Sequence, residues 1–393
     1  MVGACILCAM SARIGEESEG RRGEFLALAA LVGATVLVSL PILGNLSQQY
    51  MDFGPHLEFT RSLIRTGETS LPHFVFQYGV TFLFRLGLGL GTSAVALCLV
   101  AMVATTLVLY RIFRNETRPW LAALLSLAMG VIGPLSLVTL AEQELYLGYI
   151  TPNTYHNPTL ILLKPTALGL MWFGLRAFDP GVSKPRWGLV GAAAFLSVLS
   201  CITKPSFQIA FLPGLGLLTA LALVSRREVD LRLCVLGIAL PSFGVLGWQY
   251  LANFSDASAV QIIFSPLGVL SRFSDQLFMK LVLSLTFPLA LTLTFFPQAR
   301  REPLLQIAWS TAFFGLLYSY FLAESGERFI HGNFLWSGYI AIFALYAASL
   351  VVLLRQEKGR GMALCWAVFG LHVISGAIFA GTQALGKQYV DWW

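Results

Sequence analysis

Apolar runs about 17–22 residues long recur along this 393-residue chain, and each is long enough to cross a hydrocarbon layer about 30 Å thick as a helix. Hydrophobic residues make up 56% of the chain, the mean hydropathy is +0.73, and only 12% of residues are charged. Soluble domains do not have this composition. The predicted spans lie near 24–44, 92–110, 120–140, 158–176, 187–203, 206–224, 233–252, 277–297, 304–322, 336–354 and 362–381.

These runs predict an all-α polytopic membrane protein with about 11 transmembrane helices. Residues 24–393 form one transmembrane domain, residues 1–23 form a cytoplasmic tail, and residues 45–91 form the first outer loop. Basic residues of the tail follow its apolar start, which is not the order of a cleaved signal peptide, so we expect the first span to remain as an anchor. Cys5 and Cys8 lack the second ligand pair of a zinc site.

The run 74–90 is apolar enough to span, but it contains Arg85 and a glycine-rich end. If this run stays at the surface, the loops that hold 17 of the 26 Lys and Arg residues fall on one side of the membrane. The positive-inside rule makes that side cytoplasmic. We therefore expect 74–90 to be an interfacial or re-entrant helix. The net charge of +6 then reflects orientation and requires no nucleic-acid partner.

The first outer loop, which includes YMDFGPHLEFTRSLIRTGETSLPHF, is unusually polar for this chain. Pro55 suits the first turn of a helix, and Gly67 suits its end. The helix between them is amphipathic and should lie on the membrane surface, with His56 at its start. Asp52 has two interpretations: it is the N-cap of this helix, or it is a general base at the boundary between water and membrane.

Two further segments bring polar groups to the same predicted side. The loop 141–159 contains Tyr155, His156 and Asn157, which we expect to contact substrate, although tyrosines at this depth also form aromatic belts. Lys164 follows at the top of a span, where it either snorkels or binds an anion. Lys204, beside Pro205, places a positive charge at an outer turn. The positive-inside rule disfavours a charge there, which indicates that Lys204 has a function.

A third segment, ESGERFIHGNFLW, joins two spans on that side. Arg328 presents a fork of donors that suits a phosphate, and His331 is a second donor nearby. Glu324 and Asn333 are candidate substrate contacts. The alternative is a loop that neutralises itself, with Glu324 or Glu327 paired to Arg328. All five histidines are expected at or close to this outer face.

One early carboxylate and several cations, contributed by distant segments, suit a substrate with an anionic head group and an apolar tail. Lys and Arg meet the phosphate at the boundary while the tail lies among the spans. A carboxylate near the phosphate-bearing carbon accepts the proton of an incoming hydroxyl. A sugar on a lipid phosphate is such a substrate. The sequence contains no GxSxG, P-loop or HExxH motif.

The order of these features resembles the GT-C superfamily of membrane glycosyltransferases, in a bacterial branch. The shared features are a first span, a long outer loop with an acidic residue and a surface helix, many further spans, and the segments YHNPTLILLKP, TKPSF and ERFIHGNF. The resemblance implies an inverting sugar transfer from a polyprenyl-phosphate-linked donor at the outer face of a bacterial plasma membrane. It implies that Asp52 is the base and that Lys204, Arg328 and His331 contact the donor phosphate, with a glycan, lipid or protein as acceptor.

Members of that superfamily often carry two acids two residues apart, whereas here Phe53-Gly54 follows Asp52 and Glu58 is the next acid. This departure weakens the case for a metal. Asp52 and His56, at i and i+4, supply two ligands at most, so we expect no cofactor.

Two other classes of function remain open. A transporter or flippase for a lipid-linked or anionic solute would place polar residues at mid-span and would contain broken helices. A glycan polymerase or ligase would carry a large outer loop late in the chain. The middles of the predicted spans are apolar, apart from small residues and prolines such as Pro134, so the sequence favours the transferase.

Overall fold

The computed structural model describes residues 2–49, 51–69, 71–137, 139, 145–179, 186–254 and 260–387, with side chains from residue 22 onward. Within these ranges the regular secondary structure is helical except for one pair of three-residue strands, and turns and irregular segments join the helices. Nine described helices are long and apolar enough to cross a membrane, which indicates a multi-pass integral membrane protein. Shorter apolar helices occupy two more of the predicted spans.

The long apolar segments coincide with nine predicted spans. They are the Arg22–Leu46 part of α1 (Val2–Leu46), α4 (Leu90–Arg114), α7 (Pro158–Ala177), α9 (Ser206–Val224), the joined η1 (Leu233–Ala239) and α10 (Leu240–Phe254), α11 (Leu277–Thr294), α13 (Pro303–Phe321), α14 (Leu335–Leu354) and α15 (Arg360–Ala384). The two shorter helices are α5 (Pro119–Val131) and α8 (Trp187–Thr203), and α12 (Phe296–Ala299) is a single turn between α11 and α13.

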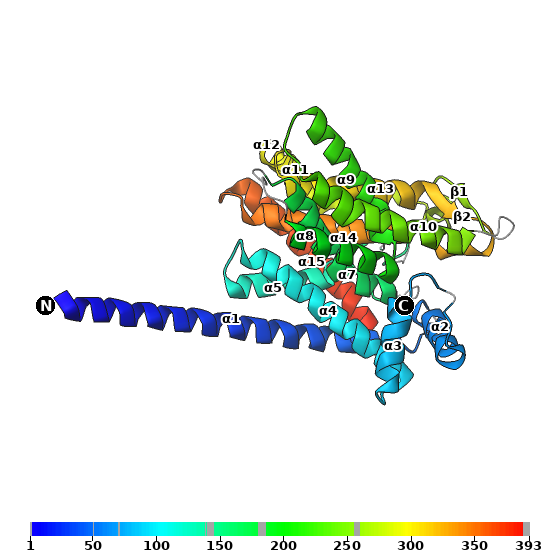
Figure 1. Ribbon diagram of the computed structural model, residues 1–393, viewed down its shortest axis with the longest axis horizontal. Coiled ribbons are helices and arrows are strands. Elements are labelled where there is room, and N and C mark those ends of the chain that lie inside the picture. The colour runs from blue at the N-terminus through cyan, green and yellow to red at the C-terminus, as the bar shows by residue number, and fades with distance from the viewer. Residues whose placement is uncertain are drawn as a thin grey trace.

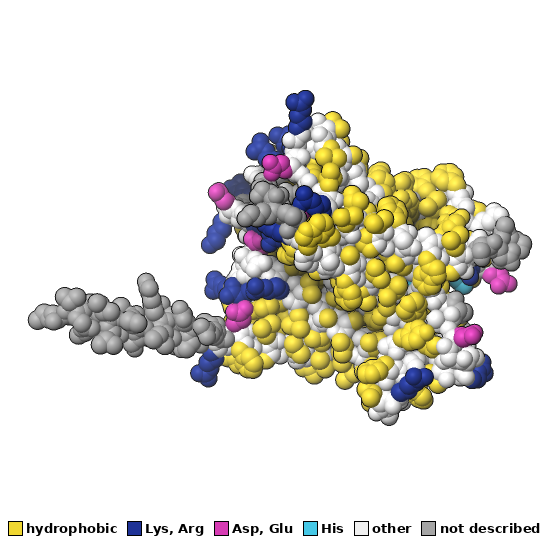
Figure 2. Space-filling view, viewed as in Figure 1, with side chains coloured by type: hydrophobic (Ala, Val, Ile, Leu, Met, Phe, Trp, Pro, Cys, Tyr) yellow, Lys and Arg dark blue, Asp and Glu magenta, His cyan; other side chains and the backbone are white. Residues whose placement is uncertain are grey.

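Helix α14 lies at the centre of the bundle. Its residues from Trp336 to Leu353 are all buried, and it packs against α7, α9, α11 and α13. A helix that is apolar on every side is stable only where other helices surround it. The outer helices expose large apolar side chains (Figure 2), as expected of surfaces that face lipid.

The first outer loop forms two short helices, α2 (Phe53–Thr66) and α3 (Val75–Arg85). Helix α2 buries Phe53, Leu57, Thr60 and Leu63 on one face and ends at Gly67, whose φ of 79° suits glycine. Helix α3 has 11 residues and spans about 16 Å, too short to cross the membrane. It lies across the direction of α1 and α4 (Figure 1) and is not among the candidate spans of the described residues, so the expectation that 74–90 does not span stays a prediction that this arrangement favours.

The predicted span 120–140 is wrong in its second half. Helix α5 ends at Val131, before Gly133-Pro134, because proline removes a helical hydrogen bond and clashes with the preceding turn. Residues 132–137 continue without helical structure among the other helices. Neighbouring helices satisfy this backbone: the Gly133 amide donates to the His372 carbonyl, and Leu135 donates to the Leu283 carbonyl. Non-helical backbone at membrane depth requires such partners.

His372 is a second correction, because it does not lie near the outer face. It occupies the middle of α15, fully buried, with Nδ1 2.7 Å from the Gly133 carbonyl oxygen and 3.0 Å from the Tyr346 hydroxyl. A buried histidine is stable when its ring nitrogens have partners. His372 therefore fixes the non-helical segment against α15.

The two ends of the bundle differ in charge. Most of the Lys and Arg side chains visible in Figure 2 gather at the end from which α1 projects. At that end Arg355 pairs with Glu116 at 2.6 Å and with Glu302 at 3.1 Å, and Arg114 lies 3.7 Å from Glu24. The opposite end carries α2, α3 and the small sheet of β1 (Ile262–Phe264) and β2 (Leu322–Glu324) (Figure 1). The strands were not predicted.

We expect Gly376→Ala to lower the free energy of unfolding by about 1–3 kcal/mol, because an added methyl overpacks a closed contact. A Cβ at Gly376 would lie 2.1 Å from the Val131 carbonyl oxygen and 2.3 Å from the Gly133 nitrogen. Gly370→Ala on the same helix is the control, since its Cβ would meet no atom within 4 Å. Thermal unfolding in detergent measures both variants, and equal midpoints would contradict the packing.

Candidate functional site

Asp52 does not cap helix α2. Its φ and ψ are −58° and −26°, already helical, and its side chain makes no capping hydrogen bond. An N-cap residue normally has extended dihedrals so that its side chain can reach the amides of the first turn. Instead, Asp52 Oδ2 accepts a hydrogen bond of 2.6 Å from Asn157 Nδ2. The N-cap interpretation is therefore wrong, and the half-buried carboxylate faces the start of α7.

Asn157 is the N-cap of α7. Its Oδ1 accepts from the Leu160 amide and from the Thr159 hydroxyl, both at 2.8 Å. A backbone N–H can only donate, so the amide oxygen must face the helix and the NH₂ group must face Asp52. One side chain thus begins a helix and presents a donor to the carboxylate.

Lys204 lies in the short break between α8 and α9, where its extended backbone (ψ 126°) precedes Pro205. Its side chain is buried, and Nζ donates to Thr159 Oγ1 at 3.1 Å. The ammonium also lies 5.2 Å from the centre of the Trp336 ring. A continuous line of hydrogen bonds therefore runs from Asp52 through Asn157 and Thr159 to Lys204. These four residues and Trp336 are called the Asp52 cluster below.

Burial lowers the pKa of Lys204 to about 8, although the negative charge of Asp52 acts in the opposite direction. Burial also lowers the pKa of His56, and that of His73 to about 3, with the positive charge of Lys204 as a further cause. The pKa of His156 is lowered mainly by burial, and Asp52 opposes that shift. At neutral pH these histidines are mostly uncharged, so Lys204 is the cation that faces Asp52.

Imidazole and aromatic rings lie around the Asp52 cluster. The His156 ring lies between Tyr146 and Trp336, with ring centres 5.3 Å and 5.5 Å away. His56 Nδ1 is 2.9 Å from Gln77 Nε2, and its ring lies 6.3 Å from that of His73. The structure therefore brings the predicted residues His56, His156, Asn157 and Lys204 to the neighbourhood of Asp52.

The predicted residues of the late loop, which precedes Trp336, make no hydrogen bond or ion pair with this cluster among the described residues. Asn333 Nδ2 donates to Glu324 Oε2 at 2.6 Å, and Glu324 is buried in β2. Arg328 is half-buried and His331 exposed in η3 (Gly326–His331). Within the described ranges neither forms an ion pair or a hydrogen bond with the cluster. The self-neutralising loop is not formed either, because none of the ion pairs among described residues includes Arg328.

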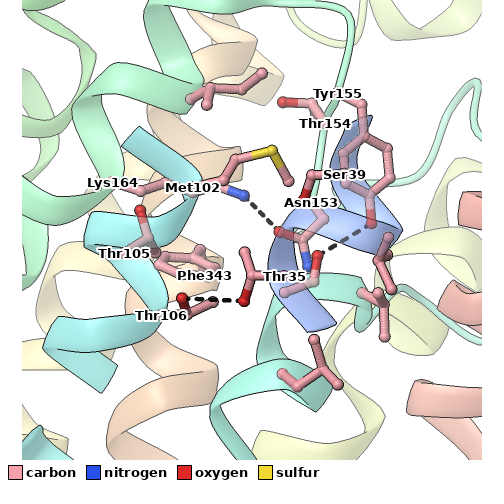
Figure 3. Close-up of a pocket in the computed structure, with 15 residues that line it drawn as sticks. Thr35, Ser39, Met102, Thr105, Thr106, Asn153, Thr154, Tyr155, Lys164 and Phe343 are labelled. Atoms are coloured by element: carbon pink, nitrogen blue, oxygen red, sulfur yellow. Dashed lines mark hydrogen bonds between the residues drawn. The ribbon is translucent and has the colours of Figure 1, made fainter. Parts of the chain in front are cut away.

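Lys164 and Tyr155 border a different space. A cavity of about 30 Å³ lies between α1, α4, α5, α7 and α14 (Figure 3). Lys164 does not snorkel: it is buried, its Nζ donates to Asn153 Oδ1, and it lies 4.6 Å from the centre of the Phe343 ring. The Tyr155 hydroxyl donates to the Gly130 carbonyl at 3.1 Å.

Sequence reasoning missed several residues of the site. Thr159 directly follows the Asn-Pro step and completes the link to Lys204, and Gln77 is a polar residue on the buried face of α3 that contacts His56. Trp336 ends the segment 324–336, in which the sequence analysis names only charged and polar residues. A further buried cation, Lys280, belongs to neither the Asp52 cluster nor the cavity lining and donates to the Leu147 carbonyl at 2.8 Å. A signal existed for Gln77 and Lys280, because a polar side chain within an apolar run needs a partner.

Comparison with protein-family models and with curated proteins finds no match to this chain. The candidate site therefore rests on its own geometry.

We expect Asn157→Asp to destabilise the protein by about 1–3 kcal/mol at pH 8, because it removes a donor to a carboxylate and places two carboxylates together. Aspartate caps helices as well as asparagine does, so the start of α7 is preserved. One carboxyl of the new pair gains a raised pKa, the folded state binds the extra proton, and stability recovers as the pH falls. Thermal unfolding at pH 8 and pH 5 measures the effect.

The double variant Asp52→Asn with Asn157→Asp is the matched control. It exchanges the two partners and restores one donor and one carboxylate, so its unfolding midpoint at pH 8 should return toward that of the parent. A double variant less stable than Asn157→Asp alone would argue against the contact.

Proposed function

We propose that this chain is a membrane glycosyltransferase that moves a sugar from a polyprenyl-phosphate-linked donor to an acceptor, with inversion, and that Asp52 is its general base. The observation that carries the proposal is the hydrogen-bonded line from Asp52 to Lys204. It joins a carboxylate and a buried ammonium from distant segments at one end of an apolar bundle. A lipid-linked phosphate suits this arrangement, because its phosphate would meet the Lys204 ammonium while its apolar tail lies along the helices.

In the proposed reaction the acceptor hydroxyl oxygen attacks the anomeric carbon of the donor sugar. Asp52 takes the hydroxyl proton as the new glycosidic bond forms. The bond between the anomeric carbon and the phosphate oxygen breaks, and its electron pair leaves with the phosphate. Lys204 stabilises the negative charge that develops there. The donor amide of Asn157 orients the Asp52 carboxylate, so that one oxygen is held and the other is available.

The proposal includes an orientation of the protein in the membrane. The end that carries Arg114 and Arg355 is basic, so the positive-inside rule places it in the cytoplasm. The Asp52 cluster then faces the outside of a bacterial plasma membrane. Arg328 and His331 belong to the segment that precedes Trp336, and we keep them as further ligands of the donor phosphate.

We expect Asp52→Asn to reduce transfer by about 10²- to 10⁴-fold and to change the donor Kd by less than a few-fold, because an amide accepts no proton but preserves the shape of the site. Purified protein, assayed with a panel of polyprenyl-phosphate sugars, provides the measurement. Glu58→Gln is the matched control: Glu58 lies on the same helix with its carboxylate exposed. Undiminished turnover in Asp52→Asn would exclude Asp52 as the base.

Donor affinity should fall as the pH rises through about 8. The protonated form of Lys204 attracts phosphate, and burial lowers the pKa of this lysine to about 8, so the charge is present below that pH and lost above it. Donor Kd values between pH 6.5 and 9.5 test this. Lys204→Arg keeps its charge throughout and should flatten the profile, whereas Lys204→Gln should bind weakly at every pH. An identical profile in all three proteins would exclude Lys204 from donor binding.

A transporter or flippase for a lipid-linked or anionic solute is the second candidate, and the end of α5 inside the bundle favours it. Discontinuous helices beside a polar cavity are common at substrate sites of transporters. One preparation of purified protein distinguishes the two candidate functions. Sugar transfer by the protein in detergent supports the enzyme. Solute flux into liposomes, with no transfer from any donor, supports the transporter.

A further inference from the structure

The cavity beside Lys164 lies inside the bundle and does not belong to the Asp52 cluster. Residues of α1, α4, α5, α7 and α14 and of the segment that precedes α7 line it (Figure 3). Its volume of about 30 Å³ gives room for about two water molecules, because each water needs roughly 10–15 Å³ measured this way. A sugar or a polyprenyl phosphate does not fit.

Lys164 brings an ammonium to this cavity without a matching carboxylate. Its partners are the amide oxygen of Asn153 and the face of Phe343, and within the described part of the chain no ion pair includes it. The Asn153 amide is fixed, because Nδ2 donates to the carbonyls of Met129 at 2.9 Å and Ile132 at 2.8 Å. A buried ammonium without a counter-charge is costly.

Thr154 adds a second donor. Its side chain is fully buried and lines the cavity, and Oγ1 has no hydrogen-bond partner. The other threonines that line the cavity donate to carbonyls of their own helices: Thr35 to Leu31, Thr105 to Ala101 and Thr106 to Val103. An unpartnered buried hydroxyl in a native fold requires an explanation, and beside a cavity a bound water or ion is one that fits.

We propose that this cavity is a binding site for a small monovalent anion, with chloride as the fitting example, held by the Lys164 ammonium and the Thr154 hydroxyl. The anion supplies the counter-charge of the buried lysine. Asn153 holds both Lys164 and the carbonyls of Met129 and Ile132 at the end of α5, so neutralising the Lys164 charge stabilises the junction between α5 and α7. The site is independent of the proposed transferase chemistry.

The test is thermal unfolding of the purified protein, followed by intrinsic tryptophan fluorescence, in chloride and in gluconate at equal ionic strength. Chloride should raise the unfolding midpoint with saturation, because a ligand that binds only the folded state stabilises it. Bromide should act similarly, and sulfate should not, because the cavity is small. Thr154→Val and Lys164→Met should abolish the chloride shift.

Thr311→Val is the matched control, because the buried Thr311 hydroxyl donates to its own helix at Ile307, outside the cavity. It should keep the full shift, and so should Asp52→Asn, which separates this site from the transferase proposal. Equal midpoints in chloride and gluconate would overturn the inference. So would an undiminished chloride shift in Thr154→Val, a variant that removes one hydroxyl and decides the question even if Lys164→Met does not fold.

Discussion

The Asn157 side chain connects the fold of this protein to its candidate chemistry. The Asn157 oxygen caps the start of α7 by accepting the Leu160 amide, and that bond turns the NH₂ group toward Asp52. The Thr159 hydroxyl extends the same contact to Lys204. Orientation of the carboxylate is therefore a consequence of starting a helix. Substitution of such a capping residue should destabilise the protein, because loss of its bond to the backbone or of its bond to the carboxylate leaves a buried polar group unpaired.

Much of the fold follows from the apolar runs, and the parts that do not have identifiable causes. Hydropathy predicts where helices lie because each run must satisfy its own backbone in lipid. It does not predict that α5 ends at Val131, since Gly133-Pro134 is tolerated in many membrane helices. The break is stable here because His372 and Leu283, far along the chain, supply the missing hydrogen-bond partners. Such partners depend on tertiary packing, which a local pattern does not contain.

Lys164 and Lys204 show the same limit within the site. Each precedes a proline next to an apolar run, so their sequence contexts are nearly equivalent. In the structure one lysine meets Thr159 and Trp336 beside a carboxylate, and the other meets Asn153 and Phe343 inside the bundle. The sequence predicted Asp52 as the key acid but could not tell whether it capped a helix, because that depends on the dihedral angles at a single residue.

The two candidate functions make different demands on these lysines. A transferase needs its cation beside the carboxylate and at the end of the bundle, where a head group can reach both, and Lys204 meets that demand. A transporter needs a charge that the solute passes inside the bundle, and Lys164, buried in the first half of α7, is a cation that such a solute would meet. Lys164 is fixed, however, by an amide that also holds the end of α5. A cation tied to the fold in this way suits a resident counter-ion better than a passing solute, and this weighs toward the transferase.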